Sequence, residues 1–159
     1  MSSAKAKVYV ETTVVSYLTA RKTRDPIAIA HQAVTRRWWR RRKRFDLYCS
    51  QIVVREAGAG DAGAAGRRLA ALKGVPSLEI NDLVKELAAA VATAASLPKK
   101  ATEDALHIAL ATVHGMEYLL TWNCKHIANA EIRNVVGAVA YDHGYGVPVI
   151  CTPEELMGE

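Results

Sequence analysis

Cysteine, proline and phenylalanine are scarce in this chain. Its 159 residues include three cysteines, five prolines and one phenylalanine. The cysteines, Cys49, Cys124 and Cys151, have no paired spacing, which argues against a disulfide framework, a zinc ribbon and a C-x-x-C redox site. Cys124 and His126 are close enough in sequence to share a metal ion, but two such residues alone are a weak signal.

The chain also lacks a long hydrophobic run. Its apolar stretches are far shorter than the roughly 20 residues that a membrane-spanning helix needs. The opening MSSAKAKVYV has neither the apolar core nor the small-residue cleavage site of a signal peptide. Half of the residues are hydrophobic and the mean hydropathy is +0.01. We therefore expect a soluble, cytoplasmic protein that makes no membrane contact and folds as one domain over residues 1–159.

Short apolar runs alternate with helical patterns along the whole chain. The runs that we expect to form strands are KVYV at 7–10, DLYC at 46–49, SLEI at 77–80, YLLT at 118–121 and PVIC at 148–151. Because these runs do not alternate strictly between apolar and polar residues, they suit strands that are buried on both faces of a parallel sheet. The pattern predicts an α/β protein, with three α/β/α layers and a mostly parallel central sheet.

Capping residues predict where the helices begin and end. The expected helices begin at Thr12 or Thr13, run over 26–44, follow Ser50 through Ala57, follow Asp61 to Gly74, follow Asn81, run from Thr102 to Gly115 and cover 130–143. In the second helix the expected apolar stripe is Ile27, Ala30, Val34, Trp38 and Phe45. TPEEL near the C-terminus has the pattern of a capping box.

Four side chains with carboxylate or amide oxygens stand where a parallel sheet binds ligands, near the carboxyl ends of its strands. Glu11 closes the first apolar run, and Asn123 follows the fourth by a tight turn. Glu56 follows the second run, on an apolar helix face, and Asp104 lies in the first turn of its helix. Taken singly, Glu56 reads equally well as a surface residue, Asp104 as an ordinary helix-terminal acid and Asn123 as a turn residue.

Taken together, these side chains suggest a metal site. Carboxylates that share one cleft repel each other, and a bound divalent cation is the usual relief. A set of oxygen ligands without histidine or cysteine prefers a hard ion, Mg²⁺ or Mn²⁺. Such an ion binds phosphate and can promote hydrolysis of a phosphodiester.

The order of these motifs resembles the PIN-domain ribonucleases, and among them the VapC-type toxins of toxin–antitoxin pairs. The opening strand ends in an acid, with Thr12 beside it and SYL in the helix that follows. VVREA carries Glu56, EDALHIALA carries Asp104, and LLTWNCKHIAN supplies Thr121 and Asn123. The last two stretches are the most specific, and the resemblance spans nearly the whole chain.

The resemblance implies an endonuclease that cleaves RNA and leaves a 5′-phosphate and a 3′-hydroxyl. It gives the role of metal ligands to Glu11, Glu56, Asp104 and, directly or through a water, Asn123. Thr12 and Thr121 are implied supports for the carboxylates. The family usually has Asp at the first position and often at the fourth, so Glu11 and Asn123 are departures that affect the number of metals. The implied partners are an RNA substrate, a cognate antitoxin and a second copy of the chain.

His107 and a basic block admit several readings. His107, three residues after Asp104, fits a satisfied, half-buried histidine better than a site residue. The net charge of +5 is concentrated in TRRWWRRRKRF, 35–45, which we call the basic ridge. Its residues Arg37, Arg40, Arg41 and Arg44 share a helix face. They suit RNA phosphates, with Trp39 stacking on a base, or a solvated helix face, or a contact with an antitoxin or a second copy.

Two rival functions remain from the sequence. GAGDAG at 58–63 matches G-x-G-x-x-G, and QIVV as a preceding strand with Glu79 as the ribose acid would make a dinucleotide-binding unit. The second rival is a non-catalytic module of the same fold that binds RNA or a partner protein, with a metal site weakened by Asn123. An aspartyl phosphatase needs a second acid two residues after the first, where Thr13 stands, and no P-loop or G-x-S-x-G elbow occurs.

Overall fold

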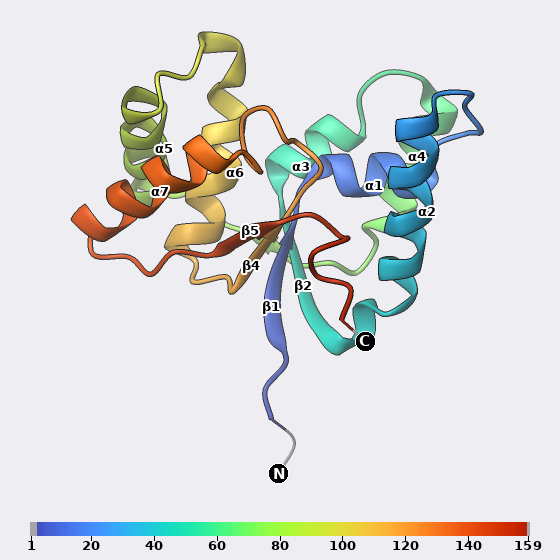
Figure 1. The fold of residues 1–159 in the computed structure, drawn as a ribbon, viewed down its shortest axis with the longest axis horizontal. Coiled ribbons are helices and arrows are strands. Elements are labelled where there is room, and N and C mark those ends of the chain that lie inside the picture. Colours follow the sequence, from blue (N-terminus) through green and yellow to red (C-terminus); the bar gives the residue numbers. More distant parts are fainter. Residues whose placement is uncertain (1–2, 159) are drawn as a thin grey trace.

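Five parallel strands form one sheet in the order β3-β2-β1-β4-β5. The computed structural model describes residues 3–158. The strands are β1 (Ala6–Val10), β2 (Phe45–Ser50), β3 (Ser77–Leu78), β4 (Tyr118–Leu120) and β5 (Val149–Cys151). All five runs expected to be strands are confirmed, although the expected strand at 77–80 is only two residues long. The all-parallel sheet between two sets of helices confirms the three-layer α/β/α expectation (Figure 1).

Helices cover both faces of the sheet. They are α1 (Thr12–Thr19), α2 (Pro26–Arg40), α3 (Gln51–Ala57), α4 (Ala62–Ala71), α5 (Asp82–Ala94), α6 (Thr102–Val113) and α7 (Ala130–Asp142), with short 3₁₀ turns η1 (Arg42–Arg44) and η2 (Lys99–Ala101). Figure 1 shows α1, α2 and α4 gathered on one side of the sheet and α5, α6 and α7 on the other. Within residues 3–158, no helix has the length and apolar character needed to cross a membrane.

The core is built around β1, the central strand. Val8, Tyr9 and Val10 are buried, as expected for a strand covered on both faces. Strand order reverses at β1, because β2 lies on one side of it and β4 on the other. In open parallel sheets, ligands bind beyond the carboxyl ends of the strands at such a switch point. The residues just after β1, β2 and β4 are therefore the ones to inspect.

Helix α2 differs from its prediction. It ends at Arg40 rather than Arg44, because the chain turns through η1 and Phe45 begins strand β2. The predicted apolar stripe is wrong at its start, since Ile27 and Ala30 are exposed. A second discrepancy is α4, which ends at Ala71.

The face of α2 that is buried carries polar groups. Its buried residues are Gln32, Thr35 and Trp38. Gln32 Nε2 donates to Ala20 O at 2.5 Å, and Thr35 Oγ1 accepts from the indole N–H of Trp122 at 2.7 Å. Because these polar groups are satisfied by hydrogen bonds, they are tolerated inside the protein, and apolar periodicity cannot find them.

The other residues predicted to begin or end helices agree better with the structure. Ser50, Asp61 and Asn81 each cap the helix predicted for it, and Gly115 adopts a φ of +68° after α6. TPEEL forms turns rather than a helix, yet Thr152 and Glu155 still make the reciprocal capping-box hydrogen bonds. The dinucleotide-binding alternative is wrong, because QIVV lies in helix α3, so a helix rather than a strand directly precedes the glycines.

Candidate metal centre at the carboxyl end of the sheet

Glu11 directly follows β1 and caps α1. Its carboxylate Oε2 accepts from the backbone N–H of Thr13 at 2.9 Å, and Oε1 accepts from the Thr13 hydroxyl at 2.6 Å. Oε1 also accepts from the hydroxyl of Thr121, beyond β4, at 2.5 Å. The residue is only 4% exposed. A carboxylate can be buried at this strand–helix junction because donors from two neighbouring strand ends hold it.

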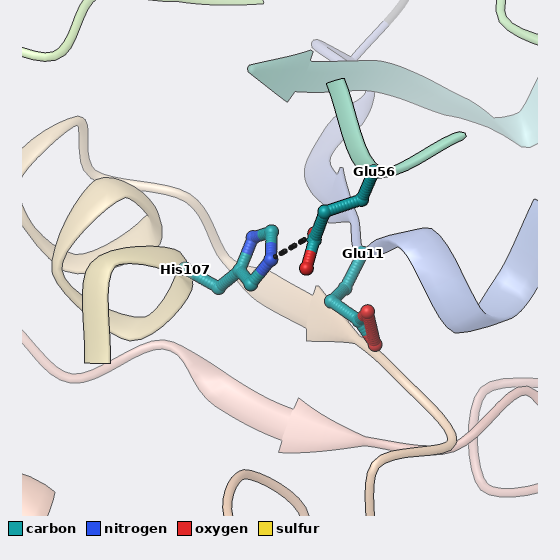
Figure 2. A group of neighbouring side chains, drawn as sticks. All are labelled: Glu11, Glu56 and His107. Atoms are coloured by element: carbon teal, nitrogen blue, oxygen red, sulfur yellow. Dashed lines mark hydrogen bonds and ion pairs between the residues drawn. The ribbon is translucent and has the colours of Figure 1, made fainter. Parts of the chain in front are cut away.

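Glu56 reaches the same place from helix α3, which follows β2. Its Oε1 accepts from the hydroxyl of Thr12 at 2.7 Å, and His107 Nε2 lies at 2.7 Å from the same oxygen. One candidate ligand atom from each of Glu11, Glu56 and His107 lies within 4.8 Å of the others (Figure 2). Within residues 3–158, this is the one such group of three or more side chains of metal-ligand type. We call these three residues the buried cluster.

His107 is anchored at both ring nitrogens. Nδ1 lies 2.7 Å from the Tyr9 hydroxyl, which in turn lies 2.8 Å from Ser50 Oγ. In the protonated imidazole, Nε2–H donates to Glu56 and Nδ1–H donates to the Tyr9 oxygen, while the Tyr9 hydroxyl donates to Ser50. His107 is thus the satisfied histidine that the sequence favoured, although it is fully buried and touches the cluster directly.

His107 and Glu56 each stabilise the charged form of the other. Burial opposes protonation of His107, but the hydrogen bond to Glu56 and the charges of Glu11, Glu56 and Asp104 outweigh it and raise the pKa of His107. Burial likewise opposes ionisation of Glu56, but the hydrogen bond and charge of His107 and the Thr12 hydroxyl lower the pKa of Glu56. Burial raises the pKa of Tyr9 well above its usual value, so its phenol stays protonated. Both pKa shifts favour the charged forms of Glu56 and His107 over the neutral ones.

Asp104, Asn123 and His126 form a second group, which we call the outer cluster. Asp104 Oδ1 accepts from the side-chain amide of Asn123 at 3.1 Å, and Oδ2 lies 3.0 Å from His126 Nδ1. The Asn123 side-chain oxygen accepts from the backbone N–H of His126 at 3.0 Å. Asp104 comes from the first turn of α6, and the other two residues come from the loop after β4.

Threonine hydroxyls join the two clusters. Thr121 donates to Glu11 and accepts from the backbone N–H of Asn123 at 2.9 Å. Thr13 donates to Glu11 and accepts from the backbone N–H of Trp122 at 2.8 Å. The loop after β4 is therefore fastened to the end of β1, so the positions of the acids in both clusters depend on one another.

The four proposed ligands thus fall into two pairs. Glu11 and Glu56 come together in the buried cluster, while Asp104 and Asn123 pair with each other in the outer cluster. Asp104 lies near enough for its charge to raise the pKa of His107. Thr12 and Thr121, singled out as supports, each donate a hydrogen bond to a carboxylate of the buried cluster.

Sequence reasoning missed the roles of Tyr9, Thr13 and His126. Tyr9 lies inside a strand that reads as purely apolar, and its hydroxyl partners are 41 and 98 residues away. The sequence predicts Thr13 as a helix cap and not as a support for Glu11. His126 was considered with Cys124, but Cys124 is exposed and His126 bonds Asp104 instead. The spacing N-x-x-H in WNCKH was the available signal, because it places His126 one turn beyond Asn123.

The basic ridge ends far from the carboxylates. Arg41 and Arg44 flank the beginning of β2 and donate to backbone carbonyls of Met157 and Gly158. The buried cluster lies beyond the other end of β2, about 16 Å away along the strand. Arg42 lies 4.7 Å over the ring of Trp39, so the guanidinium covers a face on which a base would stack. Arg37 and Arg40 are exposed on α2.

No protein-family model matches this chain, and no curated protein matches it. What the site does is therefore argued from its own geometry.

Proposed function

We propose that this protein is a metal-dependent endoribonuclease that hydrolyses RNA phosphodiester bonds. The observation that carries the proposal is the buried cluster, in which Glu11 and Glu56 offer ligand atoms within 4.8 Å of each other at the switch point of a parallel sheet. Asp104, in the outer cluster, is a third carboxylate whose charge acts on His107 of the buried cluster. Three acids from separate segments repel one another, which favours a site that takes up a cation.

The side chains fit a hard divalent ion. Glu56 Oε2 makes no hydrogen bond among the described residues, and Glu11 Oε2 and both oxygens of Asp104 have one partner each, so these oxygens keep free lone pairs. Glu11 Oε1 and Glu56 Oε1 each have two partners already. Oxygen ligands of this kind suit Mg²⁺ or Mn²⁺. The chemistry that such an ion supplies is activation of the attacking water and stabilisation of the departing oxygen.

The surrounding residues would position the ligands. Thr12 holds Glu56, and Thr121 and Thr13 hold Glu11, so these carboxylates are oriented before any ligand arrives. Asn123 donates to Asp104, so its effect on the site is to fix that carboxylate. His107 pairs with Glu56 and offsets one negative charge in the absence of an ion.

A cellular role as the toxin of a type II toxin–antitoxin pair follows from the resemblance in sequence alone. The antitoxin and the homodimer stay predictions of that resemblance. Expression of the wild-type chain without an antitoxin is expected to arrest growth of a bacterial host, whereas Asp104→Asn is expected to permit growth.

A second candidate is a non-catalytic module that binds RNA or a partner protein. Both oxygens of Glu11 already accept hydrogen bonds, and the Asn123 oxygen accepts the N–H of His126. These contacts hold the site together without an ion, which favours a scaffold role. The two candidates differ in one property, cleavage that requires both a divalent ion and the carboxylates.

The test is cleavage of single-stranded RNA by the purified protein with Mn²⁺, Mg²⁺ or EDTA. We expect cleavage only with a divalent ion, and at least about a hundredfold slower cleavage by Glu56→Gln and by Asp104→Asn. Glu131→Gln is the matched control, because Glu131 is an exposed acid in the first turn of α7, as Asp104 is in α6. RNA binding without ion-dependent cleavage would leave only the non-catalytic module.

A further inference from the structure

A cavity of about 400 Å³ lies between α1 and α4. Its lining residues are Ser16, Thr19, Ala20, Arg21, Asp61, Ala64, Arg67 and Arg68. We call it the arginine pocket. None of these residues belongs to the metal centre or to the basic ridge, and no sequence pattern groups them.

We propose that the arginine pocket binds a backbone phosphate of single-stranded RNA, adjacent to the nucleotide at the buried cluster. The choice of RNA as the ligand rests on the nuclease proposed above. The charge of the pocket, its free hydrogen-bond donors and its distance from the carboxylates support the assignment.

Two of the arginines are held in place by backbone carbonyls. Arg67 Nε donates to Thr19 O at 3.3 Å, and Arg68 donates to Ala57 O at 2.8 Å and to Ala59 O at 2.6 Å. These bonds leave both terminal nitrogens of Arg67 without a hydrogen-bond partner among the described residues. Both Arg67 and Arg68 are only partly exposed. A guanidinium fixed through Nε presents its other N–H groups as a fork, which matches the oxygens of a phosphate.

The pocket carries a net positive charge. Within residues 3–158, no carboxylate lies within salt-bridge distance of Arg21, Arg67 or Arg68. Asp61 also lines the pocket, but its Oδ2 is engaged as the cap of α4, accepting from the N–H of Ala64 at 2.9 Å. Three guanidinium groups against one carboxylate leave an excess of two positive charges, which an anion would neutralise.

Helix α1 connects the pocket to the metal centre. Thr12 donates to Glu56, and Ser16 donates to the backbone carbonyl of Thr12 at 3.0 Å. Ser16 and Thr19 lie about 6 Å and about 10 Å along the helix axis from Thr12. A strand lying along α1 would therefore meet both the carboxylates and the pocket, whereas Arg41 and Arg44 lie at the opposite end of β2.

Two hydroxyls of the lining suit an RNA ligand. Ser16 and Thr19 line the pocket and donate their protons to backbone carbonyls of α1, so their oxygens remain available as acceptors. A ribose 2′-hydroxyl can donate to such an oxygen, and a carboxylate cannot. Arginines for the phosphate and hydroxyl oxygens for the sugar together suit a nucleotide.

The test measures binding of a fluorescein-labelled, single-stranded oligoribonucleotide in EDTA, where no cleavage occurs. We expect the double variant Arg21→Gln/Arg67→Gln to bind about tenfold more weakly than the wild type. The slope of log affinity against log salt should shrink by about 0.7 for each phosphate that the variant no longer neutralises. Lys73→Gln is the matched control, since it removes one exposed charge just beyond the end of α4, outside the pocket.

The single variant Arg21→Gln tests the pocket even if the double variant fails to fold. Its own folding should be unaffected, because Arg21 is exposed and has no hydrogen bond among the described residues. Equal affinity in the arginine variants and Lys73→Gln would overturn the proposal, as would an absence of RNA binding by the wild type. Binding of a polyglutamate peptide that requires Arg21 and Arg67, with RNA binding unaffected, would assign the pocket to an acidic protein and also overturn it. Arginine-dependent RNA binding without Mn²⁺-dependent cleavage would support the pocket and refute the nuclease, so the two failures are distinguishable.

Discussion

Two histidine–carboxylate pairs stand at the carboxyl end of the sheet, and their histidines differ in burial. His107 lies 2.7 Å from Glu56, and their side chains are 1% and 29% exposed. His126 lies 3.0 Å from Asp104, and their side chains are 17% and 20% exposed. The first histidine comes from the middle of the core-facing part of α6, and the second from the loop after β4.

The difference in histidine burial indicates which pair stabilises the fold and which pair is accessible to a ligand. His107 uses its second nitrogen on Tyr9, so removing it would take one hydrogen bond each from the buried Tyr9 hydroxyl and from Glu56. His126 uses one ring nitrogen on Asp104, and its other ring nitrogen has no hydrogen bond among the described residues. The buried pair is therefore part of the core, whereas the outer pair can rearrange at a smaller cost.

The largest expected effect compares the two histidines directly. His107→Leu keeps the volume but removes the imidazole that bonds both Glu56 and Tyr9, so we expect a loss of about 3 kcal/mol in the free energy of unfolding. His126→Leu removes the more exposed of the two histidines and should cost about 1 kcal/mol or less. Urea denaturation in EDTA measures both. Equal losses for the two variants would contradict the division into a core pair and an outer pair.

Much of this arrangement follows from the sequence. The apolar runs locate all five strands, and the rule that ligands bind beyond the carboxyl ends of parallel strands points to Glu11, Glu56 and Asn123. Glu56 stands out because a carboxylate interrupts the apolar face formed with Ile52 and Val53. Local pattern and topology are enough for these residues because each is defined by its nearest strand or helix.

The remaining features depend on contacts between distant segments. The hydrogen bonds from Ser50 to Tyr9 and from Tyr9 to His107 join three elements, β2, β1 and α6. Nothing in the sequence pattern around Tyr9 shows that its hydroxyl is needed. The buried face of α2 is similar, because Thr35 is stabilised by Trp122, 87 residues away. Periodicity reports which faces are apolar, so it misses polar groups that become buried by pairing.

A change in the outer cluster should have the next largest effect. Asn123→Asp replaces the amide that donates to Asp104 with a second carboxylate, so we expect a loss of about 1–2 kcal/mol of stability in EDTA. Mn²⁺ should reverse this loss of stability. It should also bind Asn123→Asp more tightly than it binds the wild type, because the added carboxylate is a further ligand. Denaturation with and without Mn²⁺ tests both expectations.

Asn129→Asp is the control for that comparison. Asn129 lies just after the same loop and caps α7 through its side-chain oxygen, a role that Asp fills equally well. Its stability should be close to that of the wild type with and without Mn²⁺. If Mn²⁺ stabilises Asn123→Asp no more than Asn129→Asp, the outer cluster does not contribute to a metal site.

The pH dependence of stability should isolate the buried pair. The pKa of His107 is raised on folding, so its contribution is complete below about pH 6.5, the ordinary value, and is lost as the pH rises through the raised value. The pKa of Glu56 is lowered, so its contribution is complete above about pH 4.3 and is lost as the pH falls through the lowered value. The pair therefore stabilises the protein most between these two values.

In EDTA, we expect the difference in unfolding free energy between the wild type and Glu56→Gln to be largest in that window. It should shrink by about 1 kcal/mol as the pH rises through the raised pKa of His107. Glu131→Gln, which removes an exposed acid far from the pair, should follow the wild-type profile. A difference that does not vary with pH would mean that Glu56 and His107 are not an ion pair.

The smallest perturbation is chemical labelling of the cysteines, because one lies beside the outer pair and another lies near the buried pair. Cys124 is exposed in the loop of the outer cluster, and Cys49 is buried in β2, one residue before the Ser50 that bonds Tyr9. Burial raises the pKa of Cys49, and burial together with the charge of Glu155 raises the pKa of Cys151 to about 12. Both thiols are therefore inaccessible and protonated at neutral pH.

Iodoacetamide should modify Cys124 of the native protein at least about a hundredfold faster than Cys49 or Cys151, as measured by mass spectrometry of the digested chain. In His107→Leu, labelling of Cys49 should accelerate, because the reagent reaches it through opening of the weakened core, while His126→Leu should leave it slow. Rapid labelling of Cys49 in the wild type would show that β2 is already open beside the buried pair. In that case the outer cluster would be the better-ordered of the two, and the division of roles between the two histidines would have to be reversed.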